Sequence, residues 1–425
     1  MDFIRKDGRI DIDAEIENGN IVEDEEEQRG ARLNKFWFNN YRYMYKDVYQ
    51  FTYEDYAEMI ASKLANKLNI KCAKYDLAIH NGNIGVITES LIEDNTNEEL
   101  ISGQEIMNRV YTEYIQPIND TMIEYEKLKE KYNARNINEF SNLSKEQQLE
   151  LRKKLLYLVN DINDKNFDII KDKFNSNDID FAEIDKIYEY LESYNNIYNS
   201  DFLEMKGGIV KANNLYDIWS VLEIYSSINN YNIDIETEMN NLINMFIFDI
   251  ITSQSDRHAE NWSIILNNKD KTIRLCPLYD NSGICSLNRE KAIKNIVSYD
   301  NDLQDKNIRE NKKKNIKRLL ESTINHSNSG LKVDLSDVEE KNKNKKMLQK
   351  FIINSDEIFN KKLQTFANSI DEMTLDEIYE EIEKQTGIKV PDDVKKIVKV
   401  VIFNNKKMIN ETYTEGGKVR WKEKK

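Results

Sequence analysis

One stretch of the sequence, residues 253–285, constrains the fold most strongly because polar loops in it alternate with strand-like runs. It begins with the loop Asp256-Arg-His-Ala-Glu-Asn261 and ends with the turn Pro277-Leu-Tyr-Asp280-Asn-Ser-Gly283. Between these loops, two short apolar runs flank a cluster of turn-forming residues, which predicts a β-hairpin with strands at 262–266 and 272–276. A hairpin returns the chain to its starting point, so residues from both loops can form one site.

The residue types in the two loops suit the transfer of a γ-phosphoryl group. That reaction needs a carboxylate to orient and deprotonate the attacking hydroxyl, and oxygen ligands for Mg²⁺ on the phosphates. Asp256 is the candidate base, and Asn261 and Asp280 are the candidate metal ligands, because an amide oxygen ligates a hard cation without adding a second charge. His258 is predicted to organise the loop by packing and by bonding its backbone. The alternative is a polar loop in which Asp and Asn only form turns.

These two loops resemble the catalytic and metal-binding loops of HipA-like kinases, atypical serine/threonine kinases that include toxins of bacterial persistence modules. The order Asp256-Arg-His-x-x-Asn261 is also similar to that of phosphoinositide kinases. The resemblance covers roughly residues 30–110 and 240–290. It implies an α+β, two-lobed protein-kinase-like fold, with a small β-rich N-lobe and a large, mostly helical C-lobe. It also implies ATP and Mg²⁺ as cofactors.

Residues 30–92 show strand and helix patterns in the order of a kinase N-lobe. The predicted elements are strands at 35–38 and 41–45 joined by a tight turn at Asn39-Asn40, a helix at 53–69, and strands at 75–80 and 83–92 around Asn81-Gly82. The acidic residues 1–30 predict a short strand or two and a mobile loop.

Lys46 closes the second of these strands, and in such an N-lobe it would reach the α- and β-phosphates of ATP. A carboxylate from the following helix is expected to hold the lysine in place. The family pattern favours Glu58, while helical geometry gives Glu54 nearly as good a claim, because the two lie one turn apart. The resemblance also implies that Arg32 or Lys35 covers the phosphates, although the glycine-rich loop of ordinary kinases is absent.

The sequence becomes polar after residue 92, which predicts the hinge between an N-lobe at 1–92 and a C-lobe at 93–425. Backbone groups near Leu91 and Glu93 are the candidates for bonding the adenine edge.

Most of the predicted C-lobe has helical patterns. Residues 103–203 are expected to form a helical insertion or substrate-facing cap, and a structural extension of the C-lobe is an equal alternative. Apolar helices are predicted at 216–231 and 238–252, and several amphipathic helices at 305–425, one of them starting at Pro391. An activation segment is expected at 281–309, with candidate phosphorylation sites at Ser282, Ser286, Ser298 and Tyr299.

Charge, cysteine spacing and the distribution of apolar residues argue against several classes of protein. The net charge is −15, from 76 acidic and 61 basic residues, which disfavours nonspecific nucleic-acid binding. The three cysteines have no Cys-x-x-Cys spacing, so we expect neither a zinc site nor a disulfide framework. No signal-peptide pattern and no apolar run long enough for a bilayer is present, so a cytoplasmic protein without membrane contact is expected.

The sequence therefore predicts a kinase that phosphorylates a hydroxyl, most simply a serine or threonine of a protein substrate. Three alternatives stay open: a lipid or small-molecule kinase, a nucleotide-binding pseudokinase scaffold, and a toxin-module member with a DNA-binding, antitoxin-like partner.

Overall fold

The computed structural model describes residues 3–27, 34–131, 143–148, 150, 153, 203–206, 209–212, 215–297 and 357–416. Two compact units make up the chain. The first contains Met1–Leu100, Asp234–Asn268 and Arg274–Lys425, and the second contains Ile101–Ile233 and Lys269–Ile273. All of the predicted site residues belong to the first unit.

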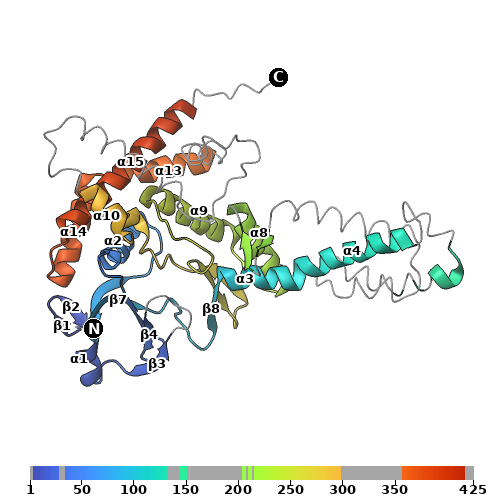
Figure 1. The fold of residues 1–425 in the computed structure, drawn as a ribbon, viewed down its shortest axis with the longest axis horizontal. Coiled ribbons are helices and arrows are strands. Elements are labelled where there is room, and N and C mark those ends of the chain that lie inside the picture. The colour runs from blue at the N-terminus through green and yellow to red at the C-terminus, as the bar shows by residue number, and fades with distance from the viewer. Residues whose placement is uncertain are drawn as a thin grey trace. The chain divides into compact units, whose positions relative to one another are not determined.

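The first unit opens with a seven-stranded sheet in the order β1-β2-β6-β7-β5-β4-β3 (Figure 1). Neighbouring strands are antiparallel, except that β2 pairs in parallel with β6. The strands are β1 (Arg5–Lys6), β2 (Arg9–Asp11), β3 (Glu23–Glu27), β4 (Lys35–Phe38), β5 (Tyr43–Asp47), β6 (Tyr75–His80) and β7 (Asn83–Glu89).

The four strands expected between residues 35 and 92 are all present, with two corrections: β7 ends at Glu89 rather than at residue 92, and the first hairpin differs. β5 begins at Tyr43 rather than at residue 41, because Asn39, Asn40 and Tyr41 all have left-handed φ values. The connection is therefore longer than a two-residue turn, and Lys46 lies inside the strand. At the β6–β7 hairpin, Asn81 and Gly82 have φ values of 50° and 77°, as the predicted tight turn requires.

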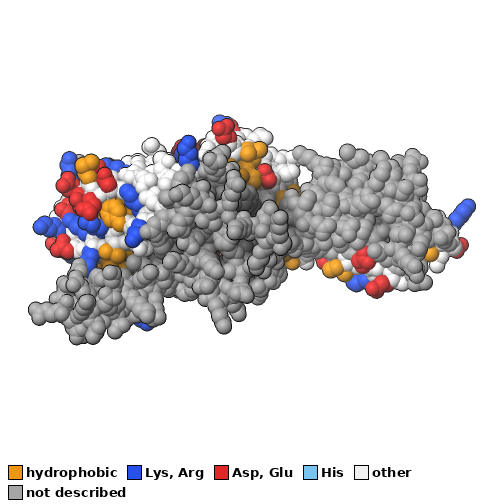
Figure 2. Space-filling model, turned by 90° about the horizontal axis from the view of Figure 1, so that it is seen from above, with side chains coloured by type: hydrophobic (Ala, Val, Ile, Leu, Met, Phe, Trp, Pro, Cys, Tyr) orange, Lys and Arg blue, Asp and Glu red, His pale blue; other side chains and the backbone are white. Residues whose placement is uncertain are grey.

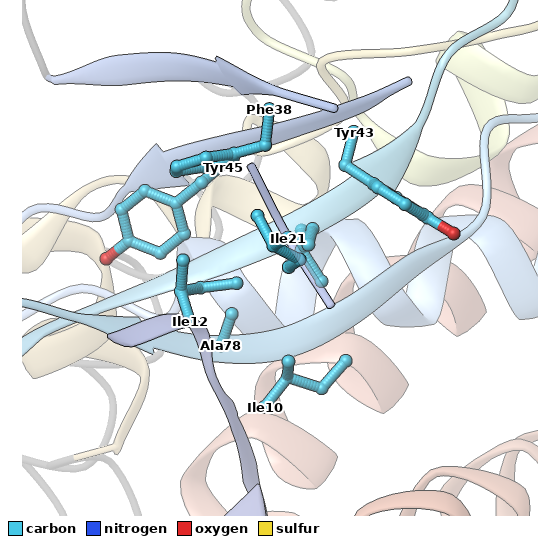
Figure 3. Close-up of a cluster of buried hydrophobic side chains, with 8 residues drawn as sticks. Ile10, Ile12, Ile21, Phe38, Tyr43, Tyr45 and Ala78 are labelled. Carbon is cyan, nitrogen blue, oxygen red and sulfur yellow. The ribbon is translucent and has the colours of Figure 1, made fainter. Parts of the chain in front are cut away.

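A buried apolar cluster lies on one face of this sheet (Figure 3). Tyr43 and Tyr45 of β5 belong to the cluster, together with Ile10, Ile12, Ile21, Phe38, Ala78 and Ile87. Successive side chains of a strand point to opposite faces. Lys46 therefore lies on the other face from Tyr45, on the side of the following helix.

That helix, α2 (Glu54–Lys67), confirms the helix predicted at 53–69. Its first eight residues are all buried. It packs on β6 and β7 and also contacts α14 (Glu372–Thr386) and the 3₁₀ turn η3 (Ile284–Ser286). Because the helix is buried on several sides, Glu54 and Glu58 are both interior residues.

The rest of the first unit is mostly helical. Helix α15 (Asp392–Gly416), which starts directly after Pro391 as predicted, packs against α9 (Ile235–Thr252), α10 (Glu290–Val297), α13 (Glu357–Ser369) and α14. Asn405 of α15 donates to the carbonyl of Ile251 at 2.9 Å and to the Ser253 hydroxyl at 2.7 Å. These bonds fix the carboxyl end of α9, from which the predicted catalytic loop leaves.

The hairpin predicted after Asn261 is confirmed. Strands β12 (Ser263–Asn267) and β13 (Thr272–Leu275) are hydrogen-bonded neighbours, and the Cys276 N–H donates to the Ser263 carbonyl at 2.9 Å. A further strand, β8 (Glu98–Ser102), follows the expected hinge.

The second unit contains the start of the long helical segment. Helix α3 (Gly103–Val110) continues through the π-helical turn η1 (Tyr111–Ile115) into α4 (Gln116–Lys131), and the rest of the predicted insertion, after residue 131, lies largely outside the described residues. The hairpin β9 (Leu203–Lys206) and β10 (Ile209–Ala212) was not predicted. Helix α8 (Leu215–Ile228), which confirms the apolar helix at 216–231, packs on α3 and on β11 (Asn232–Ile233).

The α+β class, with a sheet-rich N-terminal part and a mostly helical remainder, is confirmed. The lobe boundary at residue 92 stays a prediction. At the start of the chain, helix α1 (Ile12–Glu17) was not predicted. None of the helices in the described part of the chain has the length and apolar character needed to cross a membrane.

Candidate active site

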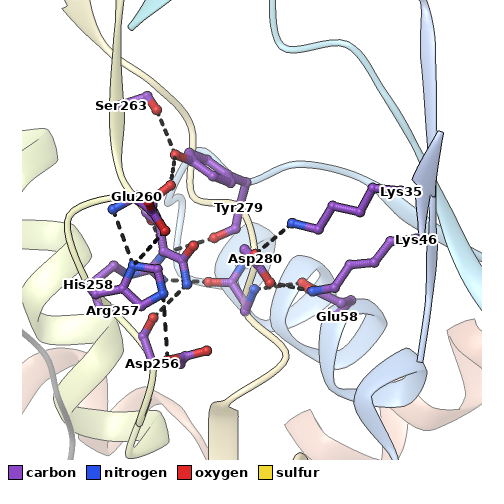
Figure 4. Close-up of polar contacts among 12 residues, drawn as sticks. Lys35, Lys46, Glu58, Asp256, Arg257, His258, Glu260, Ser263, Tyr279 and Asp280 are labelled. Carbon is purple, nitrogen blue, oxygen red and sulfur yellow. Dashed lines mark hydrogen bonds and ion pairs between the residues drawn. The ribbon is translucent and has the colours of Figure 1, made fainter. Parts of the chain in front are cut away.

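Lys46, Glu58 and Asp280 meet in one buried cluster (Figure 4). The Lys46 Nζ forms an ion pair with the Asp280 carboxylate and lies 3.5 Å from Glu58 Oε1. Lys46 is 6% exposed and Glu58 is 1% exposed. Residues 234 positions apart are thus brought together by β5, by α2 and by the turn that follows β13.

Glu58, not Glu54, is the carboxylate that contacts Lys46. Glu54 instead accepts the backbone N–H of Tyr49 at 3.2 Å, so it secures the connection between β5 and α2. Glu58 has a second partner, because its Oε2 accepts the N–H of Asn281 at 2.7 Å. The Glu58 carboxylate therefore links Lys46 of β5 to Asn281, the residue after Asp280.

Lys35 also reaches Asp280. Its Nζ lies 3.5 Å from Asp280 Oδ2, and on the sheet Lys35 of β4 is directly opposite Lys46 of β5. Like charges opposite one another destabilise a sheet. The Asp280 carboxylate offsets this repulsion by pairing with both ammonium groups.

The charges in this cluster shift one another's pKa values. Burial alone raises the pKa of Asp280, but the charges of Lys46 and Lys35 outweigh burial and hold it well below its usual range. Burial alone lowers the pKa of Lys46, and the carboxylates of Asp280 and Glu58 reverse this, so the pKa of Lys46 is raised. Burial raises the pKa of Glu58 to about 7, against the opposing effect of Lys46. Asp280 and Lys46 are therefore both charged at neutral pH.

The conformation of Asp280 is held by its neighbours in the metal loop, which we define as residues 277–283. Asp280 has a left-handed φ of 52°, and its N–H donates to the Tyr75 hydroxyl at 3.1 Å. Together with the Asn281–Glu58 bond, this fixes the backbone on both sides of the carboxylate. A left-handed backbone conformation costs free energy in a residue other than glycine, and it persists where surrounding contacts hold it in place.

The catalytic loop, residues 256–261, is closed by hydrogen bonds of its own. The Asn261 Nδ2 donates to the Asp256 carbonyl at 2.7 Å, and the Asn261 N–H donates to the His258 carbonyl at 2.9 Å. This leaves the amide oxygen of Asn261 as the group that can ligate a cation. The Asp256 side chain is 45% exposed, so an acceptor hydroxyl can reach it from solvent.

His258 has only part of its predicted role. Its Nδ1 accepts the Glu260 N–H at 3.3 Å, so it does bond the loop backbone, and its Nε2 lies 3.8 Å from Asp256 Oδ1. The side chain is 46% exposed, however, so it does not pack the loop. The interior position belongs to its neighbour Arg257.

Arg257, which is 2% exposed, was missed as a site residue. Its guanidinium pairs with Asp249 of α9 at 3.1 Å and donates to groups in both loops (Figure 4). One sequence signal could have revealed it. Asp249 interrupts the apolar run 245–251, and a charge in a buried helix requires a partner.

Gln254 and Gly283 were also missed. The Gln254 side chain accepts the Asp256 N–H at 3.2 Å and donates to the Asp280 carbonyl at 3.4 Å, so it links the two loops. A Cβ on Gly283 would lie 2.2 Å from Gln254 Oε1. The glycine is therefore needed for the close approach of the loops.

The remaining predicted residues are those expected to bind adenine, to cover the phosphates or to be phosphorylated. The Glu93 N–H already donates to Glu98 Oε2 at 2.8 Å, so it must exchange partners to bond adenine. The role of Leu91 stays a prediction, and Arg32 lies outside the described residues. Ser282 and Ser286 are 5% and 1% exposed, which argues against their modification in the folded protein, and Ser298 and Tyr299 lie outside the described residues.

The side-chain oxygens of Asp280 and Asn261 suit a Mg²⁺ ion that is also bound by phosphate oxygens. Within the described ranges, no group of three or more His, Cys, Asp or Glu side chains could enclose a metal ion. Mg²⁺ is commonly held by one or two carboxylates together with substrate phosphates and water. Asp280 and Asn261 provide one charged and one neutral oxygen ligand of this kind.

Comparison with known proteins found one matching family profile and several solved structures of similar fold. The family profile described as the HipA-like C-terminal domain matches residues 195–386. The fold resembles that of the Helicobacter pylori proinflammatory kinase CtkA, with 16% sequence identity, a TM-score of 0.50, and coverage of 94% of this chain and 96% of that chain. HipA of Shewanella oneidensis MR-1, solved with HipB and operator DNA, matches with 9% identity and a TM-score of 0.40, over 96% of this chain and 72% of that chain. No curated protein matches this chain in sequence.

At such low identity the likeness to CtkA shows a shared fold, and the family profile covers the segment that contains both loops. The resemblance proposed from the two sequence motifs is thereby confirmed. Residues 195–386 of the chain match the HipA-like C-terminal domain, and the fold of the chain resembles that of the kinase CtkA.

Proposed function

We propose that this protein is a kinase that transfers the γ-phosphoryl group of Mg-ATP to the hydroxyl of a serine or threonine in a protein. The observation that carries the proposal is the cluster of Lys46, Glu58 and Asp280 beside the loop that holds Asp256 and Asn261. Phosphoryl transfer depends mainly on positioning and on charge stabilisation, and these residues can supply both.

Each residue has a distinct role in this proposal. Lys46, held by Glu58, binds the α- and β-phosphates, and Asp280 and Asn261 hold the metal ion. Asp256 orients the acceptor hydroxyl and takes its proton. When bound, Mg-ATP supplies the phosphoryl donor and neutralises part of the phosphate charge. The difference in exposure supports these assignments, because Asp280 is 17% exposed among lysines and Asp256 is 45% exposed at the surface.

Nucleotide binding would require the charged groups to exchange partners. Asp280 pairs here with Lys46 and Lys35, and while it does so its oxygens cannot all face a cation. Phosphate oxygens can replace the carboxylate as partners of both lysines. Asp280 then becomes available to Mg²⁺, and every charge in the cluster keeps an opposite charge nearby.

Two further features belong to the proposal. A DNA-binding, antitoxin-like partner is expected from the sequence resemblance, and co-purification with the product of a neighbouring gene would test it. A cytoplasmic location is likewise expected from the sequence.

The test is the transfer of label from γ-labelled ATP, with and without Mg²⁺, by purified protein alone and with cell lysate. We expect Mg²⁺-dependent label on serine or threonine of protein, absent with Asp256→Asn. Label found only in an organic extract or a small metabolite would identify a lipid or small-molecule kinase. ATP binding without transfer to any fraction would identify a pseudokinase.

A further inference from the structure

We propose that Arg257 is a positioning residue that sets the distance between Asn261 and Asp280 by holding the catalytic loop and the metal loop to Asp249 of helix α9. The inference rests on the proposed function and deepens it, because it adds a residue that acts through the two metal ligands.

The first argument is the complete use of the guanidinium group. Arginine has five N–H donors in a planar fork. The Nε donates to Asp249 Oδ2 at 3.1 Å, and Nη1 donates to the carbonyls of Asn261 at 2.7 Å and Tyr279 at 2.8 Å. Nη2 donates to Asp249 Oδ1 at 3.1 Å and to Asn281 Oδ1 at 2.6 Å. Every donor therefore has an acceptor.

The second argument is the identity of those acceptors. Apart from Asp249, three residues accept these bonds. One is Asn261, the neutral candidate metal ligand, and the other two are Tyr279 and Asn281, which flank Asp280 in sequence. Arg257 therefore holds the backbone of one ligand and both neighbours of the other. Neither metal-binding side chain is itself occupied by Arg257.

The third argument concerns the anchor. Asp249 is 1% exposed in α9, and the end of that helix is fixed by Asn405 of α15. A buried ion pair is weak evidence for stability, because removing two charges from water costs about as much as their attraction returns. The pair is better explained by orientation, since a planar fork joined to a helix gives the loops one fixed separation.

Lysine could not replace this group. Its ammonium is a single point charge with three donors, so it cannot reach Asp249 and three acceptors in two loops. Arg257→Lys keeps the charge beside Asp249 and loses the fork. It therefore separates the positioning role from the simple need to neutralise Asp249.

The structure offers a matched control on the same helix and the same hairpin. Glu238 of α9 is 5% exposed, and its Oε2 accepts the N–H of Leu275 in β13 at 2.8 Å. Glu238 links α9 to the hairpin, whereas Arg257 links α9 to the two loops. Glu238→Gln should cost stability without moving Asn261 or Asp280.

The experiment measures kcat, the KM for ATP and the Mg²⁺ concentration that gives half-maximal rate. For Arg257→Lys we expect kcat to fall roughly 100-fold, the effect that a displacement of about 1 Å can have, with the KM for ATP within about threefold of wild type. The Mg²⁺ requirement should rise, because the two ligands no longer have the right separation. Glu238→Gln should keep kcat and the Mg²⁺ requirement close to wild type.

A second variant covers the case in which Arg257→Lys is poorly folded. Asp249→Asn with Arg257→Gln removes both buried charges, so no unpaired ion remains, and it should show the same loss of kcat and the same higher Mg²⁺ requirement. Wild-type kcat and Mg²⁺ requirement in either folded variant would overturn the inference. Failure of both to fold, seen by circular dichroism, would also overturn it by making Arg257 purely structural. If wild type itself shows no Mg²⁺-dependent transfer, the proposed function fails instead.

Discussion

Asp256 and Asp280 lie in neighbouring loops but have different surroundings, and this difference separates their expected roles. Asp280 is paired with two lysines, and its pKa is held well below the usual range. The Asp256 side chain is half exposed and is not one of the groups that hold the loops together. A permanently charged carboxylate suits a metal ligand, whereas an accessible one suits a base for an incoming hydroxyl.

The first prediction is that Asp256→Asn leaves ATP binding nearly unchanged and lowers turnover by at least ~100-fold, the scale expected for loss of a general base. The amide keeps the shape of the side chain but cannot accept the proton. Calorimetric titration with Mg-ATP and the initial rate of label transfer measure the two quantities. Wild-type turnover in a folded variant would remove Asp256 from this role.

The second prediction concerns Lys46 and Glu58 as one unit. Glu58→Gln should reduce activity about as much as Lys46→Met, and the double variant should be little worse than either, because residues acting together are non-additive. Glu54→Gln is the matched control, since its amide oxygen can still accept the Tyr49 N–H. Independent, additive losses in the double variant would contradict the pairing.

The third prediction follows from the pKa of Glu58, which burial raises from its ordinary 4.5 to about 7. Between these values the folded protein holds a proton that the unfolded chain has lost, so this residue reduces the free energy of unfolding as pH rises. Glu58→Gln has no carboxyl group at this position, so its free energy of unfolding does not fall for this reason as pH rises. Its stability relative to wild type should therefore increase between about pH 5 and about pH 8, measured by urea unfolding at both values. A constant difference would show that Glu58 has an ordinary pKa.

At the residue scale, the sequence predicted the members of the charged cluster but not the groups that orient them. Asn261 and Asp280 were found because they belong to the two loop motifs, and Lys46 was found from its place in the predicted order of strands and helix. Gln254 acts on a backbone carbonyl and a backbone N–H, which every residue possesses, so no pairing pattern appears in the sequence. For Arg257, the charge of Asp249 in an apolar run signals that a buried partner is needed, but only the folded loops show that Arg257 is this partner.

Among the elements, hairpins and long helices were predicted well and short segments were not. The turn chemistry of Asn81-Gly82 and the apolar stripe of α2 are strong local signals. Helix α1 has six residues, too few for a 3.6-residue period to be recognised, and β9 and β10 have four residues each, in the short stretch between the helical segments predicted at 103–203 and 216–231. Tertiary packing decides such short elements.

The fourth prediction tests how closely the two loops must approach. In Gly283→Ala the new methyl group would lie 2.2 Å from Gln254 Oε1 and 3.2 Å from the Asp256 Cβ. We expect a loss of about 1–3 kcal/mol in stability from overpacking, accompanied by a fall in turnover. Thermal unfolding and label transfer measure the two effects.

Gly82→Ala provides the control for that change. Its φ is +77° and nothing lies within 4 Å of the added Cβ, so the loss comes only from backbone strain of about 1–2 kcal/mol. Turnover should stay at the wild-type value, because the β6–β7 turn is remote from the loops in sequence and contacts. A fall in turnover equal to that of Gly283→Ala would mean that general destabilisation explains both.

At the scale of the whole molecule, charged side chains of both signs lie on the described part of the surface. Figure 2 shows acidic and basic side chains interspersed over the described surface on that face. Charged side chains on the described helices form ion pairs with one another, as in Lys67–Glu377 at 2.8 Å and Lys399–Glu372 at 2.9 Å. Exposed pairs of this kind contribute little to stability.

The fifth prediction assigns acceptor recognition to the long segment that the sequence places at residues 103–203. Trimming residues 120–200 should impair transfer to a protein acceptor more than it impairs ATP hydrolysis, because none of the ATP-side residues lies there. Parallel assays of acceptor labelling and ATP hydrolysis make the comparison. An equal fall in both rates would assign the segment to folding rather than to recognition.

The ion pairs of the site have a consequence for the order in which the protein becomes active. Lys35 and Lys46 contact Asp280 across 245 and 234 positions of sequence, and Glu58 contacts Asn281 across 223. Contacts of such long range form only after the chain between the two partners has been synthesised. A ribosome must therefore have released more than half of the chain before the lysines meet their carboxylate, so a chain that is still growing, or that ends, before residue 280 has no assembled phosphate site.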